Sequence, residues 1–217
     1  MQLQAVIVPP SGAIDGALKM AHDIFSPEPV PEEPKRGLVG RLRKPVPAKV
    51  VPELVWVPTP PEALFVRVAK FGNVTLTDTR SLAEAIQRSA ANWPSPLLHV
   101  ASVTVGDTAP FAVVAQLEGD LGGLFGIFTH VLNLGKQQDF FLDRRSFRNE
   151  IRLGSVEVPE GAEVPEELPG AVIPLVGPQW RADHLTLFRL VGVGAAIAYE
   201  EIAAIALGQP VEDVRDS

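Results

Sequence analysis

Short apolar segments that end at proline or glycine alternate along the chain with segments of helical periodicity. A short run of β-branched residues is typical of a strand, and apolar residues that recur every three or four positions are typical of a helix. The predicted strands are residues 4–8, 54–57, 64–69, 97–105, 111–117, 147–156, 184–190 and 196–207. The predicted helices are residues 12–25, 81–91 and 121–134. This order predicts an α+β fold, and its two halves repeat a strand, a helix and a strand pair, which indicates an internal duplication.

The composition limits the possible classes of function. With 217 residues, 46% of them apolar, the chain is long enough for one large domain or two small lobes. The formal net charge of −7 argues against a protein that coats nucleic acid. The absence of cysteine excludes disulfides, thiolate metal sites and a cysteine nucleophile. The apolar run at the N-terminus is too short for a membrane span, so we expect a cytoplasmic protein without a membrane partner.

Two proline-rich segments interrupt the pattern. The acidic segment 157–169 is predicted to be a loop, and the insertion at residues 26–52 is basic. The cations of the insertion are Lys35, Arg36, Arg41, Arg43, Lys44 and Lys49. Such a composition is typical of a solvated loop, but a flap that carries phosphate-binding cations and a contact for a protein partner are open alternatives.

Six segments, in order, resemble the 2′-5′ RNA ligase and RNA 2′,3′-cyclic phosphodiesterase family of the two-histidine phosphoesterase superfamily. They are AVIVPP at residues 5–10, WV at 56–57 with PEAL at 61–64, FGNV at 71–74, EGDL at 118–121, DRRSFR at 143–148, and Trp180 with LTLFR at 185–189 and YE at 199–200. The resemblance covers nearly all of the chain outside residues 26–52 and 157–169. It implies one bilobal α+β domain over residues 1–217, in which two antiparallel sheets surround a central groove and the helices lie outside.

The family carries one H-x-[ST] motif in each lobe. One imidazole takes a proton from the attacking group while the other protonates the leaving oxygen, and each hydroxyl binds phosphate oxygens. Histidine suits both roles because its pKa lies near neutral pH.

Both motifs are replaced in this chain. The first position reads Phe65-Val66-Arg67 and the second reads Glu150-Ile151-Arg152. Phenylalanine cannot transfer a proton, and a carboxylate stands where the second imidazole belongs. We therefore expect no catalytic residues. The candidate ligand-binding residues are Phe65, Arg67, Glu150 and Arg152. The resemblance then implies a catalytically degenerate protein whose partner is a nucleotide or an RNA 3′-end.

The sequence leaves three states of the groove open. In the first, Glu150 pairs with Arg67 and Arg152, Phe65 packs beside them, and the groove is closed. In the second, the two arginines hold a phosphate or carboxylate through their planar donors and Phe65 stacks on a base. In the third, Glu150 serves as general base of a rebuilt cyclic phosphodiesterase or ligase. The remaining class of function is a non-catalytic scaffold that binds a protein partner.

His184-Leu185-Thr186 is the only H-x-T in the chain. It falls on the predicted terminal hairpin, and one such motif cannot supply both an acid and a base. We therefore expect His184 to be an edge or surface residue of a strand. No metal-binding or nucleotide-binding motif is present, so no metal and no cofactor are expected.

Overall fold

We describe the protein from a computed structural model, whose described residues are 2–25, 53–141, 147–192 and 198–208. The strands in this part of the chain are β1 (Gln2–Ile7), β2 (Val55–Pro58), β3 (Val66–Asn73), β4 (Leu97–Val105), β5 (Phe111–Gly119), β6 (Glu150–Glu157), β7 (Val172–Pro174), β8 (Trp180–Arg181), β9 (His184–Val191) and β10 (Ala198–Ala206). The helices are α1 (Asp15–Phe25), α2 (Leu76–Ala90) and α3 (Leu121–Gln137), with a 3-10 turn, η1, at Pro61–Ala63. The basic insertion at residues 26–52 lies outside the described residues.

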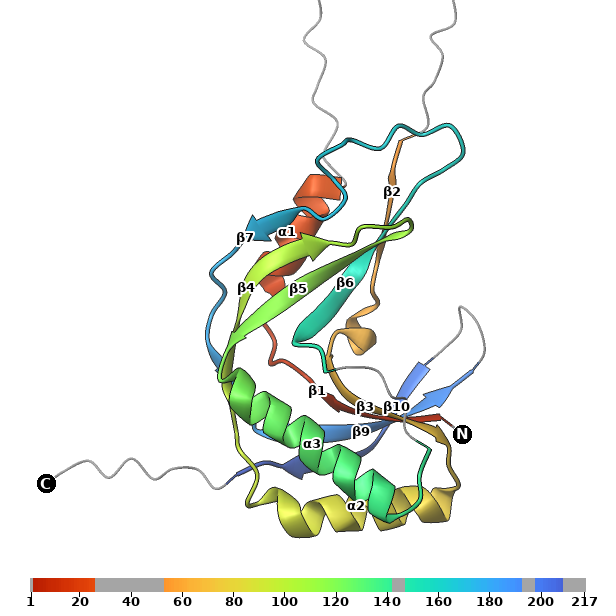
Figure 1. Ribbon diagram of the computed structural model, residues 1–217, viewed down its shortest axis with the longest axis vertical. Helices are drawn as coiled ribbons and strands as arrows, with labels where there is room; N and C mark the ends of the chain where they lie inside the picture. The colour runs from red at the N-terminus through yellow and green to blue at the C-terminus, as the bar shows by residue number, and fades with distance from the viewer. Residues whose placement is uncertain (1, 26–52, 142–146, 193–197, 209–217) are drawn as a thin grey trace, which may run out of the picture.

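The strands form two four-stranded half-sheets that meet at the centre of the molecule. Their order is β10-β9-β1-β3 in one and β6-β5-β4-β7 in the other, with β2 beside β6 and β8 beside β4, and every pairing is antiparallel. Within the described residues, β3 and β6 pair through Val66 and Ile151 alone. Figure 1 shows the first half-sheet in the lower part of the molecule and the second in the upper part.

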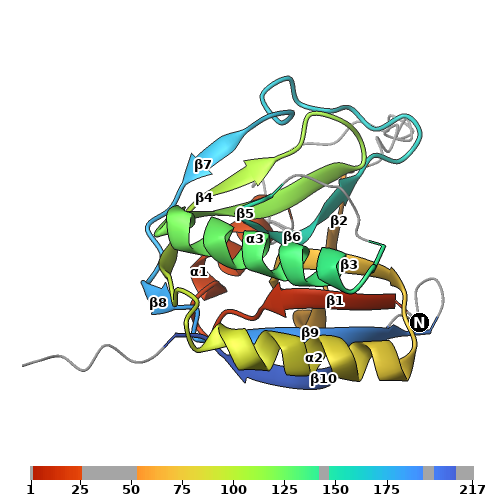
Figure 2. The same cartoon turned by 60° about the horizontal axis from the view of Figure 1, so that its bottom comes forward.

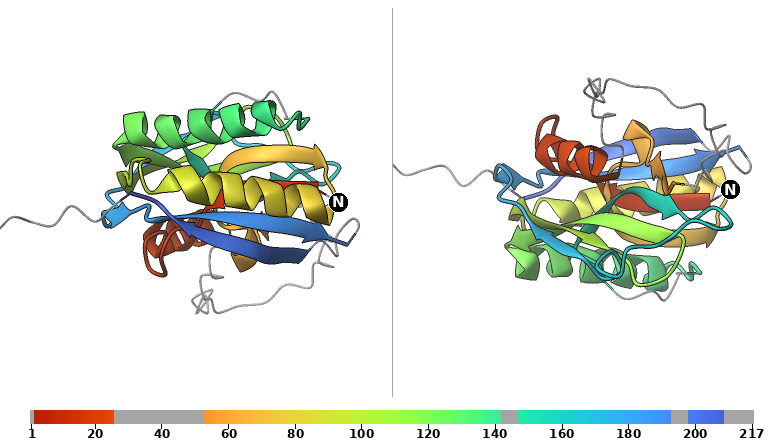
Figure 3. Two further views of the ribbon diagram at one scale, coloured as in Figure 1. Left: turned by 90° about the horizontal axis from the view of Figure 1, so that it is seen from below. Right: turned by 90° about the horizontal axis from the view of Figure 1, so that it is seen from above.

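The helices cover the outside of these strands. Helix α1 contacts β4, β6 and β2, while α2 contacts β10 and α3 contacts β3. Helices α2 and α3 lie side by side (Figure 2), and α1 and α3 lie on opposite sides of the strands (Figure 3). None of the described helices is long and apolar enough to cross a membrane. This arrangement confirms the predicted α+β class.

A β-bulge follows each of the segments 65–67 and 150–152. Val6 of β1 faces Arg67 and Ala5 faces Ala69, so Val68 is an extra residue in β3. In the other half-sheet Val114 faces Arg152 and Val113 faces Gly154, so Leu153 is an extra residue in β6. A bulge bends its strand and redirects the side chains that follow. The same irregularity at matching places in both half-sheets supports the predicted internal duplication.

Aromatic packing joins the end of α1 to β2. The rings of Phe25, the last residue of α1, and Trp56 of β2 stack with their centroids 5.5 Å apart. Trp56 also covers Gly154 of β6, where an ideal Cβ would lie 2.3 Å from the Trp56 ring. Glycine is therefore needed at this position for β2 to pair with β6.

Most predicted elements are confirmed, and the differences have local causes. Helix α2 begins at Leu76 rather than near Ser81, because Thr75 and Asp78 form a capping box that the sequence prediction did not include. Strand β6 begins at Glu150 rather than at residue 147. Strands β7 and β8 were not predicted, since each is very short and lies in a segment without alternating hydrophobicity.

The capping box makes the stability of α2 depend on pH. The Thr75 backbone N–H donates to Asp78 at 2.8 Å, and this bond, followed by the Thr75 hydroxyl, holds the pKa of Asp78 below its ordinary value of 3.8. A lowered pKa in the folded state stabilises the protein above pH 3.8, and the contribution disappears as the pH falls through the folded-state value. We expect Asp78→Asn to lower the free energy of unfolding at about pH 7, and to lower it by less at about pH 3, in urea titrations. An equal loss of unfolding free energy in Asp78→Asn at both pH values would contradict this explanation.

Candidate functional site

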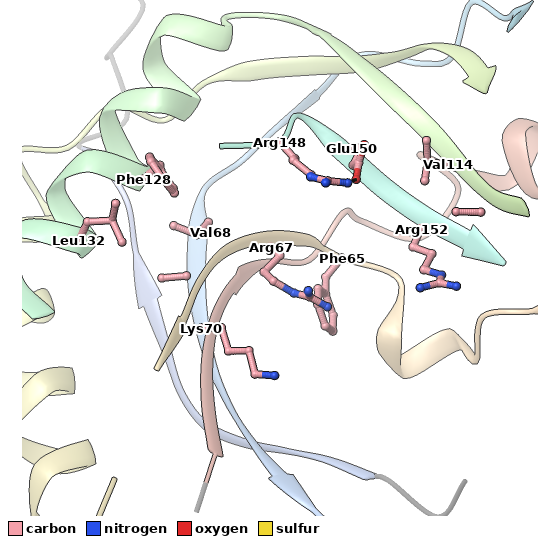
Figure 4. Close-up of a pocket in the computed structure, with 12 residues that line it drawn as sticks. Phe65, Arg67, Val68, Lys70, Val114, Phe128, Leu132, Arg148, Glu150 and Arg152 are labelled. Carbon is pink, nitrogen blue, oxygen red and sulfur yellow. Dashed lines mark hydrogen bonds and ion pairs between the residues drawn. The ribbon is translucent and has the colours of Figure 1, made fainter. Parts of the chain in front are cut away.

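A cavity of about 200 Å³ lies between the two half-sheets. It is lined from β3, β5, β6 and α3, so it draws on both halves of the fold (Figure 4). Its lining residues are Phe65, Arg67, Val68, Ala69, Lys70, Ala112, Val114, Phe128, Leu132, Arg148, Glu150 and Arg152. All four candidate residues from the sequence, Phe65, Arg67, Glu150 and Arg152, are among them.

The pairing of Val66 with Ile151 explains why the two motifs meet. Because side chains alternate along a strand, the residues on either side of this pair point away from the core and into the cavity. Val66 and Ile151 are buried, whereas Arg67 and Arg152 are exposed. The predicted register of residues 65–67 and 150–152 is therefore confirmed.

Lys70 and Arg148 also line the cavity, and the sequence interpretation missed both of them. Lys70 faces Gln4 of β1 and Arg67 faces Val6, so the bulge at Val68 brings Arg67 and Lys70 onto one face of β3. Arg148 lies just before β6, and its side chain reaches the cavity beside Glu150. The cavity thus has four cations and one carboxylate along its wall, in a chain whose net charge is −7.

Glu150 pairs with Arg148 rather than with either predicted arginine. Arg148 Nη1 donates to Glu150 Oε1 at 3.0 Å, and the two side chains are 65% and 24% exposed. In the part of the chain that the structure describes, neither Arg67 nor Arg152 forms an ion pair or a hydrogen bond through its side chain. Of the three states that the sequence left open, the first, in which Glu150 pairs with Arg67 and Arg152, is not the one observed, and no such contact closes the groove. The guanidinium groups of Arg67 and Arg152 stay available to an anion.

Phe65 forms part of the floor of the cavity. Its side chain is 5% exposed, and its ring centroid lies 5.4 Å from that of Tyr199 and 6.0 Å from that of Phe188. These contacts anchor Phe65 to β9 and β10. Phe65 is thus packed into an aromatic cluster and exposes little of its ring for stacking.

One wall of the cavity is apolar. Phe128 and Leu132 of α3 face the cations of β3 and β6 across it (Figure 4). Phe128 also packs against Phe147, whose ring centroid lies 5.5 Å away. A ligand that fits this shape combines an anionic group with an apolar or aromatic one.

The four histidines lie elsewhere. None of them is among the residues that line the described cavity: His22 is in α1, His99 in β4, His130 in α3 and His184 in β9. His184 is half-exposed at the start of its strand, and its Nδ1 lies 2.9 Å from Asp183 Oδ1. The prediction that His184 is a surface residue of a strand is confirmed.

Solved structures share this fold. Apo LigT of E. coli superposes with a TM-score of 0.63 at 14% identity, over 96% of this chain and 98% of LigT. TT0787 of Thermus thermophilus superposes with a TM-score of 0.58 at 19% identity, over 95% of this chain and 98% of TT0787. LigT has also been solved with 3′-AMP and with phosphate. The predicted two-histidine-phosphoesterase-like fold is therefore confirmed. No family model matches the sequence, and no curated protein does.

Neighbouring residues of β6 should differ sharply in their contribution to stability. The Arg148–Glu150 pair is largely solvated, so Glu150→Gln is expected to change the free energy of unfolding by less than about 1 kcal/mol. Ile151 is fully buried where the half-sheets meet, and Ile151→Ala should cost about 2–5 kcal/mol. Urea denaturation of both variants tests the contrast. A large loss for Glu150→Gln would show that the pair is structural after all.

Proposed function

We propose that the protein binds a phosphorylated ligand, a nucleotide or an RNA end, in the groove between its half-sheets and has lost the family's catalysis. The observation that carries this proposal is the charge of the cavity wall. Arg67, Lys70, Arg148 and Arg152 line one small cavity, and the single carboxylate there, Glu150, is already paired with Arg148. Cations gathered in a concave site raise the local potential and attract an anion.

Arg67 and Arg152 are the residues that we assign to the phosphate. They come from opposite half-sheets, and the Val66–Ile151 pair between them keeps their strands adjacent. A guanidinium presents several donors in one plane, which matches the oxygens of a phosphate. Each hydrogen bond between charged groups contributes about 1.5–3 kcal/mol. Two such residues on one phosphate are enough for measurable affinity.

The apolar wall and the fold favour a nucleotide over a simple anion. Phe128 and Leu132 provide a surface for a sugar or a base beside the cations. The LigT structures with 3′-AMP and with phosphate concern a protein of the same fold. They support a nucleotide as the class of ligand for this chain.

The groups that line the cavity support the proposed loss of catalysis. Acid–base cleavage of a phosphodiester needs one group that accepts a proton and another that donates one. Phe65 is apolar, and Glu150 is the one carboxylate among the described lining residues. Glu150 alone cannot fill both roles, so binding without turnover is the better interpretation of this site.

Removal of the two arginines tests the binding site. We expect wild type to bind 3′-AMP and inorganic phosphate in isothermal titration calorimetry, with an affinity that falls as salt is added. The double variant Arg67→Ala/Arg152→Ala should lose at least about tenfold in affinity, since even one lost charged hydrogen bond costs about 1.5 kcal/mol. Arg80→Ala, on the exposed side of α2, is the matched control and should bind like wild type.

Two results would end the binding proposal. One is the absence of binding by wild type at millimolar nucleotide. The other is an equal loss of affinity in Arg80→Ala and in the double variant, because a general effect of charge would then explain the binding.

Assays of turnover test the loss of catalysis. We expect no hydrolysis of a 2′,3′-cyclic nucleotide above the blank. Turnover that Glu150→Gln or His184→Ala abolishes would restore the interpretation as a rebuilt enzyme. Turnover that survives both substitutions would indicate a contaminating phosphodiesterase.

A further inference from the structure

A second cavity, of about 560 Å³, lies at the end of β1 and β3. It is lined by Gln2, Lys70, Phe71, Gly72, Asn73 and Phe141. Lys70 belongs to both cavities, so the second one continues the groove along β3. The groove cavity alone is smaller than the roughly 300–1,000 Å³ of ordinary ligand pockets, whereas the second cavity falls within that range.

Phe141 is held in place at this cavity although its side chain is 79% exposed. Its carbonyl accepts a hydrogen bond of 2.8 Å from the Gly72 backbone N–H. Its ring lies over Gly72, where an ideal Cβ would be 3.2 Å from Phe141 Cδ1. Gly72 therefore lets the ring approach the strand closely. The result is a phenylalanine that contacts β3 yet leaves most of its surface open.

The groups around Phe141 are those that bind a nucleobase. An exposed aromatic ring stacks on bases of any kind, and the side-chain amides of Gln2 and Asn73 each offer both donors and an acceptor. Asn73 lies three residues beyond Lys70 in β3, which is about 10 Å along a strand. The Lys70 ammonium stands between the two cavities, where the backbone phosphate of a short nucleic acid strand would pass.

We propose that this second cavity is a subsite for a second nucleoside, so that the preferred ligand is a phosphorylated dinucleotide or longer strand rather than a mononucleotide. This inference rests on the proposed function, because the terminal phosphate is placed at Arg67 and Arg152. It assigns Lys70 to the internucleotide phosphate and Phe141 to the second base. The chemical class of the ligand is a short single strand with a terminal phosphate.

Calorimetry with ligands of different length tests the subsite. The probes are inorganic phosphate, 3′-AMP, 5′-AMP, and the dinucleotide ApA with a phosphate on its 3′ end or on its 5′ end. We expect at least one phosphorylated ApA to bind wild type more tightly than the corresponding mononucleotide. Phe141→Ala should weaken that dinucleotide about five- to 150-fold, the loss that corresponds to one stacked base, and should leave phosphate and mononucleotide unchanged.

Two further variants separate stacking from other effects. Phe141→Trp keeps an aromatic face and should bind the dinucleotide at least as tightly as wild type. Phe125→Ala removes another exposed aromatic ring, one that lines neither cavity, and should have no effect. Because Phe141 is exposed, its replacement should leave the melting temperature close to that of wild type.

The possible outcomes distinguish this inference from the proposed function. If phosphate and mononucleotides bind but neither dinucleotide binds more tightly, the proposal of a second-nucleoside subsite is contradicted. The proposal of an anion site at Arg67 and Arg152 is then retained. The same holds if Phe141→Ala weakens all ligands equally or none of them. If no probe binds wild type, both proposals fall together.

Discussion

The pairing of Val66 with Ile151 is the contact on which the rest of the site depends. Within the described chain it is the one residue pair through which β3 and β6 are bonded, and the two half-sheets meet there. Both residues are buried, so the pair belongs to the hydrophobic core. Because neighbours of a paired residue point to the opposite face, burial of this pair sends Arg67, Glu150 and Arg152 into the groove. One core contact thus determines which side chains a ligand meets.

The bulges at Val68 and Leu153 add a second constraint. Each lies directly after an arginine and changes the face on which the next residues appear. In β3 this change brings Lys70 to the same face as Arg67 and so places a cation where the two cavities meet. The charge of the groove is therefore a product of strand geometry as much as of residue type.

Sequence patterns predicted the class of fold and four of the residues that line the cavity, since hydrophobic alternation and ordered motifs are local properties. They missed Lys70, because a strict two-residue period puts it on the face opposite Arg67, and nothing in the sequence marks the bulge. They left the partner of Glu150 open and did not consider Arg148. Arg148 lies two residues before Glu150 in the chain and needs no approach of the other half-sheet, so this local pair forms. Strands β7 and β8 depend on pairing with β4 and have no pattern of their own.

The stack of Phe25 on Trp56 has a consequence for how this fold tolerates change. The stack joins the end of α1 to β2, and Trp56 in turn lies on Gly154 of β6. The place of β2 beside β6 therefore rests on three side-by-side residues, and a substitution at one of them would be felt by the other two.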